Sequence, residues 1–280
     1  MNALPPPSGP PMGPADPANP VRPGPVPPRP APSGSPSPGR HVGRWAATAL
    51  VYRVVRRQLF SRGRLLALGL LALLVPVAAA ALGANDSASV RDGVGLIANL
   101  GFAVVVPIIS LVFGTAAIGD LREDKTLVYL WLRPLDRWPI ALGAWLAALT
   151  IVAPLSLVPV VVAAALTGAG NGLVGATLLA GVVAVAAYLA VFTLFGTVFR
   201  RATVWGLAYI LIWEGFIASG GTGVARFALR SYTRAVLREI TDVRLRLADH
   251  SLVVGVVVPL VVAVAFLALT ARRLGRLDVD

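Results

Sequence analysis

Residues 120–137 read DLREDKTLVYLWLRPLDR in one-letter code and form a charged segment between two long apolar stretches. An apolar helix of about 25 residues is expected to run into this segment from Val94, and another to leave it at Pro139. The segment contains both signs of charge: Asp120, Arg122, Glu123, Asp124, Lys125, Arg133, Asp136 and Arg137. A short charged helix between two membrane spans is suited to receiving force from a soluble partner.

The composition on either side of this segment is that of a membrane protein. The chain has 280 residues, of which 56% are hydrophobic and 14% are charged, and its mean hydropathy is +0.77. Soluble domains carry about 25% charged residues, and several apolar runs here exceed the roughly 20 residues that cross a bilayer core. We therefore expect an all-α, multi-pass protein of the plasma (inner) membrane, in contact with membrane lipids.

The charge and the cysteine content exclude several classes of function. The formal net charge is +12, but most arginines flank apolar segments, as the positive-inside rule predicts, so no nucleic-acid partner is expected. The chain has no cysteine, which excludes disulfides, thiolate metal sites and cysteine nucleophiles. We expect no metal site.

The chain divides into a tail and a membrane domain. Residues 1–43 are expected to be a disordered cytoplasmic tail, because 16 of the 23 prolines lie in residues 1–40 and such a segment cannot bury a core. Residues 44–280 are expected to form a domain of six transmembrane helices, at about 65–83, 94–119, 139–167, 173–199, 204–218 and 252–270. The fifth is short for a full span, so it is either re-entrant or continues to a break at Gly220–Gly221.

Two amphipathic helices are expected outside the spans. The first, within residues 44–64, has one apolar and one basic face, which predicts a helix in the membrane interface or a simple juxtamembrane anchor. Its faces are formed by Val51, Val54, Val55 and Leu59, and by Arg53, Arg56 and Arg57. The second, within residues 219–250, is expected on the outer surface with its arginines toward water and lipid phosphate. Its apolar stripe is Leu229, Tyr232, Val236, Ile240, Val243 and Leu247.

Basic residues predict the orientation of the spans. Seven arginines occur in residues 40–64, and further basic residues lie in the charged segment, at Arg200 and Arg201, and after the last span. In a six-span chain all of these fall on one side, which is therefore expected to be cytoplasmic together with both termini. A five-span chain would place residues 219–250 inside instead, and we favour six spans.

Residues 118–149 resemble the permease subunits of type-2 ABC exporters. In that family the second helix ends in a Gly-Asp-like step, followed by a charged turn and an Arg-Pro pair. The matching residues are Gly119, Asp120, Glu123, Thr126, Tyr129, Leu130, Arg133, Pro134 and Arg137. Lys125 replaces the glycine usual before the threonine, and Ala144 and Trp145 stand where a lysine is often found. A second match is the Trp213-Glu214-Gly215 end of the fifth helix, followed by an outer helix.

This resemblance, over about residues 45–275, implies a non-catalytic transport subunit. Residues 120–137 would be a cytoplasmic coupling helix between helices 2 and 3, docked in a groove of a separate ABC ATPase that binds ATP and Mg²⁺. The residues expected to couple to the ATPase are Arg122, Glu123, Asp124, Thr126, Tyr129, Leu130, Arg133, Pro134 and Arg137. The chain itself has no G-x-x-x-x-G-K-[ST] loop to bind phosphates. Two permeases, identical or paralogous, would form the unit, and export is favoured over import.

Glu214, near the end of the fifth apolar helix, is a second candidate site. Carboxylates within membrane spans are costly and often functional. At the outer interface Glu214 is expected to cap a helix or to pair with Arg226 or Arg230, as a structural ion pair or gate element. A substrate ligand is the alternative.

Two other classes of function remain as alternatives. A secondary transporter or a membrane scaffold would need no ATPase, but residues 65–167 and 173–270 show no convincing repeat. An intramembrane enzyme would use His250 with Ser219 or Ser251. The sequence has no H-E-x-x-H metal motif, so an enzyme is the weaker of the two alternatives.

Overall fold

The computed structural model describes residues 43–84, 89–123, 137–217, 222–245 and 250–276. Within these ranges all regular structure is helical and no β-strand occurs. The proline-rich tail expected in residues 1–43 lies outside the described residues except for Gly43, as does most of the charged segment.

Five helices in the described ranges are long and apolar enough to cross a membrane. They are α2 (Arg62–Gly83), a continuous helix over Val90–Asp120, α6 (Arg137–Leu166), α7 (Asn171–Val198) and α11 (Leu252–Gly275). The second of these joins α3 (Val90–Leu96), the π-helix η1 (Ile97–Val105) and all but the last three residues of α4 (Val106–Glu123). The chain is therefore a multi-pass, membrane-embedded protein by the length and composition of its helices.

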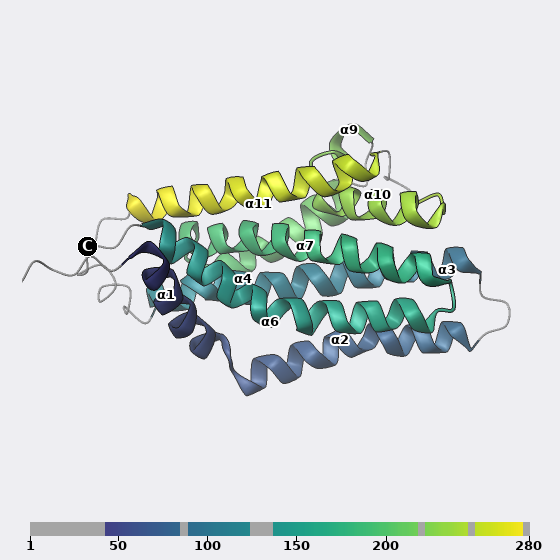
Figure 1. Cartoon of the computed structure of the whole chain (residues 1–280), viewed down its shortest axis with the longest axis horizontal. Coiled ribbons are helices and arrows are strands. Elements are labelled where there is room, and N and C mark those ends of the chain that lie inside the picture. Colours follow the sequence, from purple (N-terminus) through teal and green to yellow (C-terminus); the bar gives the residue numbers. More distant parts are fainter. Residues whose placement is uncertain (1–42, 85–88, 124–136, 218–221, 246–249, 277–280) are drawn as a thin grey trace, which may run out of the picture. The chain divides into compact units, whose positions relative to one another are not determined.

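α7 is the central helix of this bundle. In its most apolar window 72% of the residues are buried, against 22% in α2 and in α11, so these two lie at the periphery. α7 packs against α4, α6 and α11, and Figure 1 shows it between α11 and α6. Its buried rings include Tyr188 and Phe192, which are 1% and 0% exposed.

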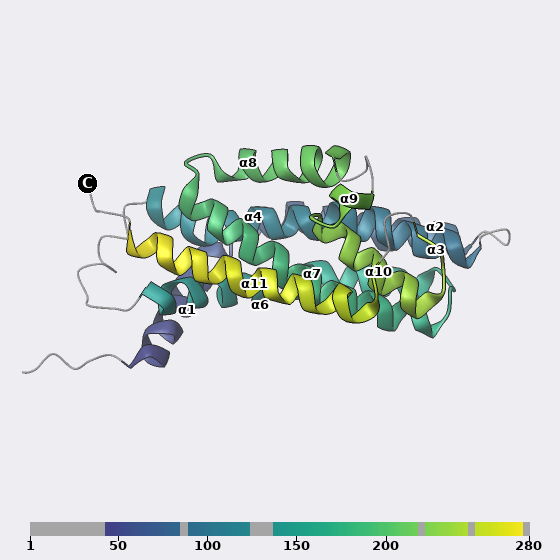
Figure 2. The ribbon, with the colours of Figure 1, turned by 90° about the horizontal axis from the view of Figure 1, so that it is seen from above.

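The fifth expected span, residues 204–218, coincides with two short helices. α8 (Ala202–Ala208, 7 residues) continues into the π-helix η2 (Tyr209–Phe216, 8 residues). At about 1.5 Å per residue this segment is roughly 22 Å long, whereas the hydrocarbon core is about 30 Å thick. A sixth crossing is therefore not among the spans that the structure supports, and it stays a prediction. Figure 2 shows the segment lying along the outer side of α4.

α1 (Arg44–Leu59) is the helix expected before the first span. Its apolar residues Val51, Val55 and Leu59 are at most 1% exposed and face α6. Val54, expected on the same face, is 44% exposed. Because protein already covers the apolar face, the position of α1 at a membrane surface stays a prediction.

α10 (Leu229–Thr241) follows the short helix α9 (Thr222–Ala225) and is buried more fully than expected. It packs against α7, α11 and η1. The expectation that its arginines face water is wrong for Arg234, which is 9% exposed and donates from Nη2 to Oδ1 of Asn99 at 2.6 Å. The helix ends at Thr241 because Asp242 adopts a left-handed conformation with φ 56°. The apolar stripe expected to continue through Val243 is therefore broken.

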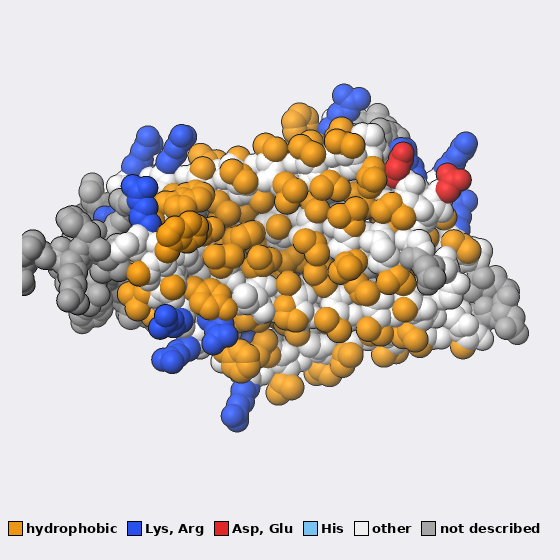
Figure 3. All heavy atoms as spheres, viewed as in Figure 1, with side chains coloured by type: hydrophobic (Ala, Val, Ile, Leu, Met, Phe, Trp, Pro, Cys, Tyr) orange, Lys and Arg blue, Asp and Glu red, His pale blue; other side chains and the backbone are white. Residues whose placement is uncertain are grey.

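The surface has an apolar middle and basic ends. In Figure 3 hydrophobic side chains cover the central part, and arginine side chains gather toward the two ends. Large apolar residues of the peripheral helices are 60–69% exposed, including Leu66, Leu70 and Val77 on α2 and Val261 and Val264 on α11. Such a surface would be unfavourable in water and is suited to lipid.

Candidate functional site

Most of the expected ATPase-coupling residues lie outside the described residues: Asp124, Thr126, Tyr129, Leu130, Arg133 and Pro134. Arg122 and Glu123 close α4, and Arg137 opens α6, so the structure defines the helix ends on either side of the segment. A Cβ on Gly275 would be 3.7 Å from Cγ of Arg137. The end of α11 therefore lies beside the start of α6, at the end of the bundle where α1 also lies (Figure 1).

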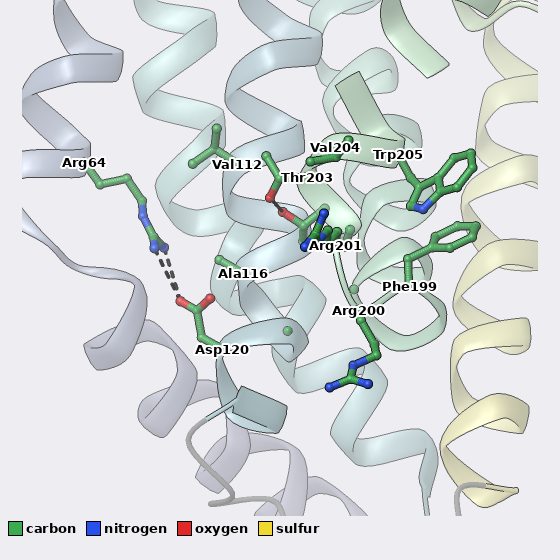
Figure 4. A pocket seen from close by; sticks show the side chains of 14 residues that line it. Arg64, Val112, Ala116, Asp120, Phe199, Arg200, Arg201, Thr203, Val204 and Trp205 are labelled. Carbon is green, nitrogen blue, oxygen red and sulfur yellow. Dashed lines mark hydrogen bonds and ion pairs between the residues drawn. The ribbon is translucent and has the colours of Figure 1, made fainter. Parts of the chain in front are cut away.

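A cavity of about 1060 Å³ lies at this same end. Its walls come from the start of α2, the end of α4, the end of α7 and the start of α8. Figure 4 shows side chains from these four helices around it. Segments far apart in the sequence thus meet next to the helix that enters the charged segment.

Three arginines and one aspartate line the cavity. Arg64 reaches from α2 to Asp120 on α4, with Nη1 and Nη2 each 3.4 Å from Oδ2 (Figure 4). These side chains are 30% and 33% exposed, so the pair contributes only about 0–1 kcal/mol to stability. Arg200 and Arg201 lie on the turn between α7 and α8, across the cavity from this pair, and both are exposed. The lining therefore carries a net positive charge.

Close packing of α7 on α4 positions the turn that carries these arginines. A Cβ on Gly196 would lie 2.6 Å from the carbonyl oxygen of Thr115, so the approach of the two helices requires glycine there. α7 then ends at Val198, and the next residue, Phe199, is extended (φ −101°, ψ 137°). The hydroxyls of Thr115 and Thr203 are 3.3 Å apart and join α8 to α4. The rings of Phe199 and Trp205 stack with centroids 5.4 Å apart, which fixes α8 against the end of α7.

Glu214 forms a second polar cluster, at the far end of η2. Its side chain is 3% exposed. Oε1 accepts hydrogen bonds from the Tyr209 hydroxyl at 2.9 Å and the Leu229 N–H at 2.8 Å, and Oε2 accepts one from the Arg230 N–H at 3.1 Å. Leu229 and Arg230 are the first two residues of α10, whose N–H groups have no partner within the helix. The carboxylate therefore caps α10 and is favoured by the positive end of the helix dipole.

This geometry assigns Glu214 the capping role that was one of the expectations. Arg230 contacts the carboxylate through its backbone N–H. The carbonyl of Arg226 accepts a hydrogen bond from the Tyr232 hydroxyl, so this residue also takes part in the local structure through its backbone. A gating role for the three residues stays a prediction.

The residues considered for an enzyme have structural neighbours. The His250 ring stacks on Tyr232, with centroids 4.8 Å apart and an interplanar angle of 13°. Ser251 precedes the first turn of α11, and Ser219 lies outside the described residues. Among the described residues no group of three or more His, Cys, Asp or Glu side chains is placed to hold a metal ion.

Sequence reasoning missed the cavity and the ion pair in its wall. Arg64 and Asp120 are 56 residues apart, and no periodic pattern joins them. Asp120 was included in the charged segment, whereas Arg200 and Arg201 indicated only the side of the membrane. The combination of an Arg-Arg turn with an aromatic residue on each side was the available signal.

No protein-family model matches the chain, and no curated protein matches it.

Proposed function

We propose that this chain is the membrane-spanning permease subunit of an ATP-driven exporter of the type-2 ABC kind. The observation that carries the proposal is the charged segment itself. It leaves one candidate span at Glu123 and enters the next at Arg137. The resemblance of residues 118–149 and 206–231 to such permeases supports the same reading.

The composition of the segment suits docking to a soluble subunit. Leu127, Tyr129 and Leu130 offer an apolar surface, while Glu123 and Arg133 supply charges that set register and exclude wrong partners. Pro134 favours a helix end, because the residue before a proline avoids the helical region. ATP and Mg²⁺ are bound by the partner ATPase, and this chain binds neither.

The helices that leave the segment provide a route for movement. α4 and α6 both pack on the central helix α7, so a push on the segment displaces helices that contact the middle of the bundle. In this proposal closure of two ATPases on ATP reorients a pair of permeases, either two copies of this chain or this chain and a paralogue. In this proposal the cavity end and both termini are cytoplasmic, because more of the described arginines lie at that end than at the other. Residues 202–216 then act as a sixth span.

The test is recovery of the ATPase with the intact chain. The full-length protein is affinity-purified from its native membrane in a mild detergent, and the bound proteins are identified by mass spectrometry. Arg133→Glu is compared with Arg272→Glu, which reverses a charge at the end of α11, outside the segment. We expect a stoichiometric ATPase with the wild type and with Arg272→Glu, and its loss with Arg133→Glu.

Two results would contradict the proposal. Normal recovery of the ATPase with Arg133→Glu would remove the coupling role of the segment. Absence of any ATPase from a wild-type preparation that retains its other complexes would favour a secondary transporter or a membrane scaffold. Transport by the purified chain driven by an ion gradient without ATP would then identify the former.

A further inference from the structure

We propose that the cavity between α2, α4, α7 and α8 binds an anionic amphiphile, a molecule with one phosphate-like group and an apolar chain. The proposal stands on the charge of the lining, the apolar walls and the size of the cavity. It concerns binding by this chain alone and does not depend on an ATPase partner.

The charge of the lining selects an anion. Three arginines face one aspartate, a net charge of +2. Asp120 already accepts hydrogen bonds from both terminal nitrogens of Arg64. Arg200 and Arg201 are therefore the cations available to a ligand. Within the described part of the chain, the side chain of neither arginine forms an ion pair or a hydrogen bond, and only the carbonyl of Arg201 accepts hydrogen bonds, from the start of α8. Guanidinium groups bind oxyanions through paired N–H donors, so two on one turn suit a phosphate-like group.

The walls select an apolar chain. Val112, Ala116 and Ala202 contribute aliphatic surface next to the arginines. Val204 and Trp205, at the start of α8, also line the cavity and are 62% and 56% exposed. The apolar wall of the cavity therefore continues onto the exposed surface of α8, where an apolar chain can extend.

The size of the cavity argues against a lone inorganic anion. Its volume of about 1060 Å³ is slightly above the roughly 300–1000 Å³ of small-molecule sites. Arginines at the membrane interface are explained in general by topology, but topology does not require them to share a cavity with apolar walls. Arg272 and Arg273 are the internal comparison, because they lie at the end of α11 and do not line the cavity.

The experiment measures binding to the purified full-length chain in a non-ionic detergent, by calorimetry. The probes are a short-chain phosphatidic acid, a phosphatidylcholine and a diacylglycerol with the same chains, and inorganic phosphate. We expect binding of the phosphatidic acid and at least roughly tenfold weaker binding of the other three. If inorganic phosphate binds as tightly as the phosphatidic acid, the apolar chain is not recognised and the proposal of an amphiphilic ligand is wrong. If the zwitterionic or the uncharged lipid binds as tightly, the proposal of an anionic headgroup is wrong.

Variants locate the site. The double variant Arg200→Gln/Arg201→Gln is expected to lower the affinity for phosphatidic acid by roughly ten- to a hundredfold, because two charge-assisted contacts are lost. The matched double variant Arg272→Gln/Arg273→Gln is expected to bind as the wild type does. An equal loss of affinity in both double variants would show a non-specific surface effect. Unchanged affinity in Arg200→Gln/Arg201→Gln would place the site elsewhere.

A second pair of variants keeps the test valid if the double variant does not fold. Val204 is exposed and lines the cavity, so Val204→Glu and Val204→Gln differ only in charge at one tolerant position. We expect Val204→Glu to bind the phosphatidic acid roughly tenfold or more weakly than Val204→Gln. Equal affinities would overturn the assignment of the headgroup to this cavity.

Discussion

Replacing Glu214 by alanine should unfold the start of α10 without unfolding the bundle. The carboxylate is the acceptor for the N–H groups of Leu229 and Arg230, at 2.8 and 3.1 Å. Neither has an intrahelical partner at this position, and Leu229 is 5% exposed. Each orphaned donor costs about 1–3 kcal/mol, so opening of the first turn should become easier by about 3 kcal/mol. This corresponds to roughly a hundredfold faster amide exchange at these two residues.

Hydrogen exchange on the full-length chain in detergent, read on peptides covering residues 227–241, measures this effect. Tyr209→Phe is the matched control, because it removes the third hydrogen bond to Glu214 and leaves both backbone contacts in place. We expect Tyr209→Phe to destabilise the protein by about 1 kcal/mol and to leave the protection of the α10 amides from exchange near normal. Unchanged exchange at the start of α10 in Glu214→Ala would refute the capping role. A uniform increase over all helices would refute its local character.

Two further substitutions test the packing of buried elements by thermal unfolding in detergent. Gly196→Ala should destabilise the protein by about 1–3 kcal/mol, because the added Cβ would lie 2.6 Å from the carbonyl oxygen of Thr115. The control Gly175→Ala, on the same helix with nothing within 4 Å of the added Cβ, should be neutral or stabilising. Equal effects of the two substitutions would contradict the reasoning. Arg234→Leu should cost about 1.5–3 kcal/mol through loss of the bond to Asn99. An unchanged melting temperature would show that this bond adds nothing.

The positions of the long helices could be predicted because the signal is local. An unbroken apolar run longer than a bilayer core has few alternatives to a helix, and the run expected from residue 252 begins in the structure at Leu252. The number of crossings could not be predicted in the same way. Residues 202–216 are apolar enough but too short, and their composition does not show that the helix widens to a π-helix at Tyr209.

The packing of individual residues depends on neighbours that the sequence does not show. Gly175 and Gly196 lie on one helix in similar apolar surroundings, yet only the second faces a backbone close enough to exclude a Cβ. Arg234 lies on a helix with an apolar stripe, so exposure was the reasonable expectation. Burial became possible because Asn99, 135 residues earlier, supplies an acceptor, and a buried charge is tolerated only with such a partner.

The candidate site, too, could be predicted only where the signal is local in the sequence. A lone acidic residue near the end of an apolar helix is easily recognised in a sequence, because an unsatisfied carboxylate in lipid is energetically unfavourable. Glu214 could therefore be selected from the sequence alone. Its acceptor role toward Leu229 joins two residues that are 15 positions apart in the sequence, which no local pattern shows. The cavity was invisible because Arg64, Asp120 and Arg200 come from three separate helix ends.

The attachment of residues 202–216 to the bundle connects the two clusters. Four residues of this segment are buried, Ala202, Gly206, Ile210 and Glu214, and each follows the last by four positions. One narrow stripe therefore holds the segment, with small residues beside the cavity and the carboxylate at the other end. Ring packing of Trp205 on Phe199 and of Tyr209 on Phe192 adds to this attachment, and a hydrogen bond is found at each end of the segment. A ligand between α4 and α8 would act on the first of these ends, and loss of the Glu214 cap would release the second.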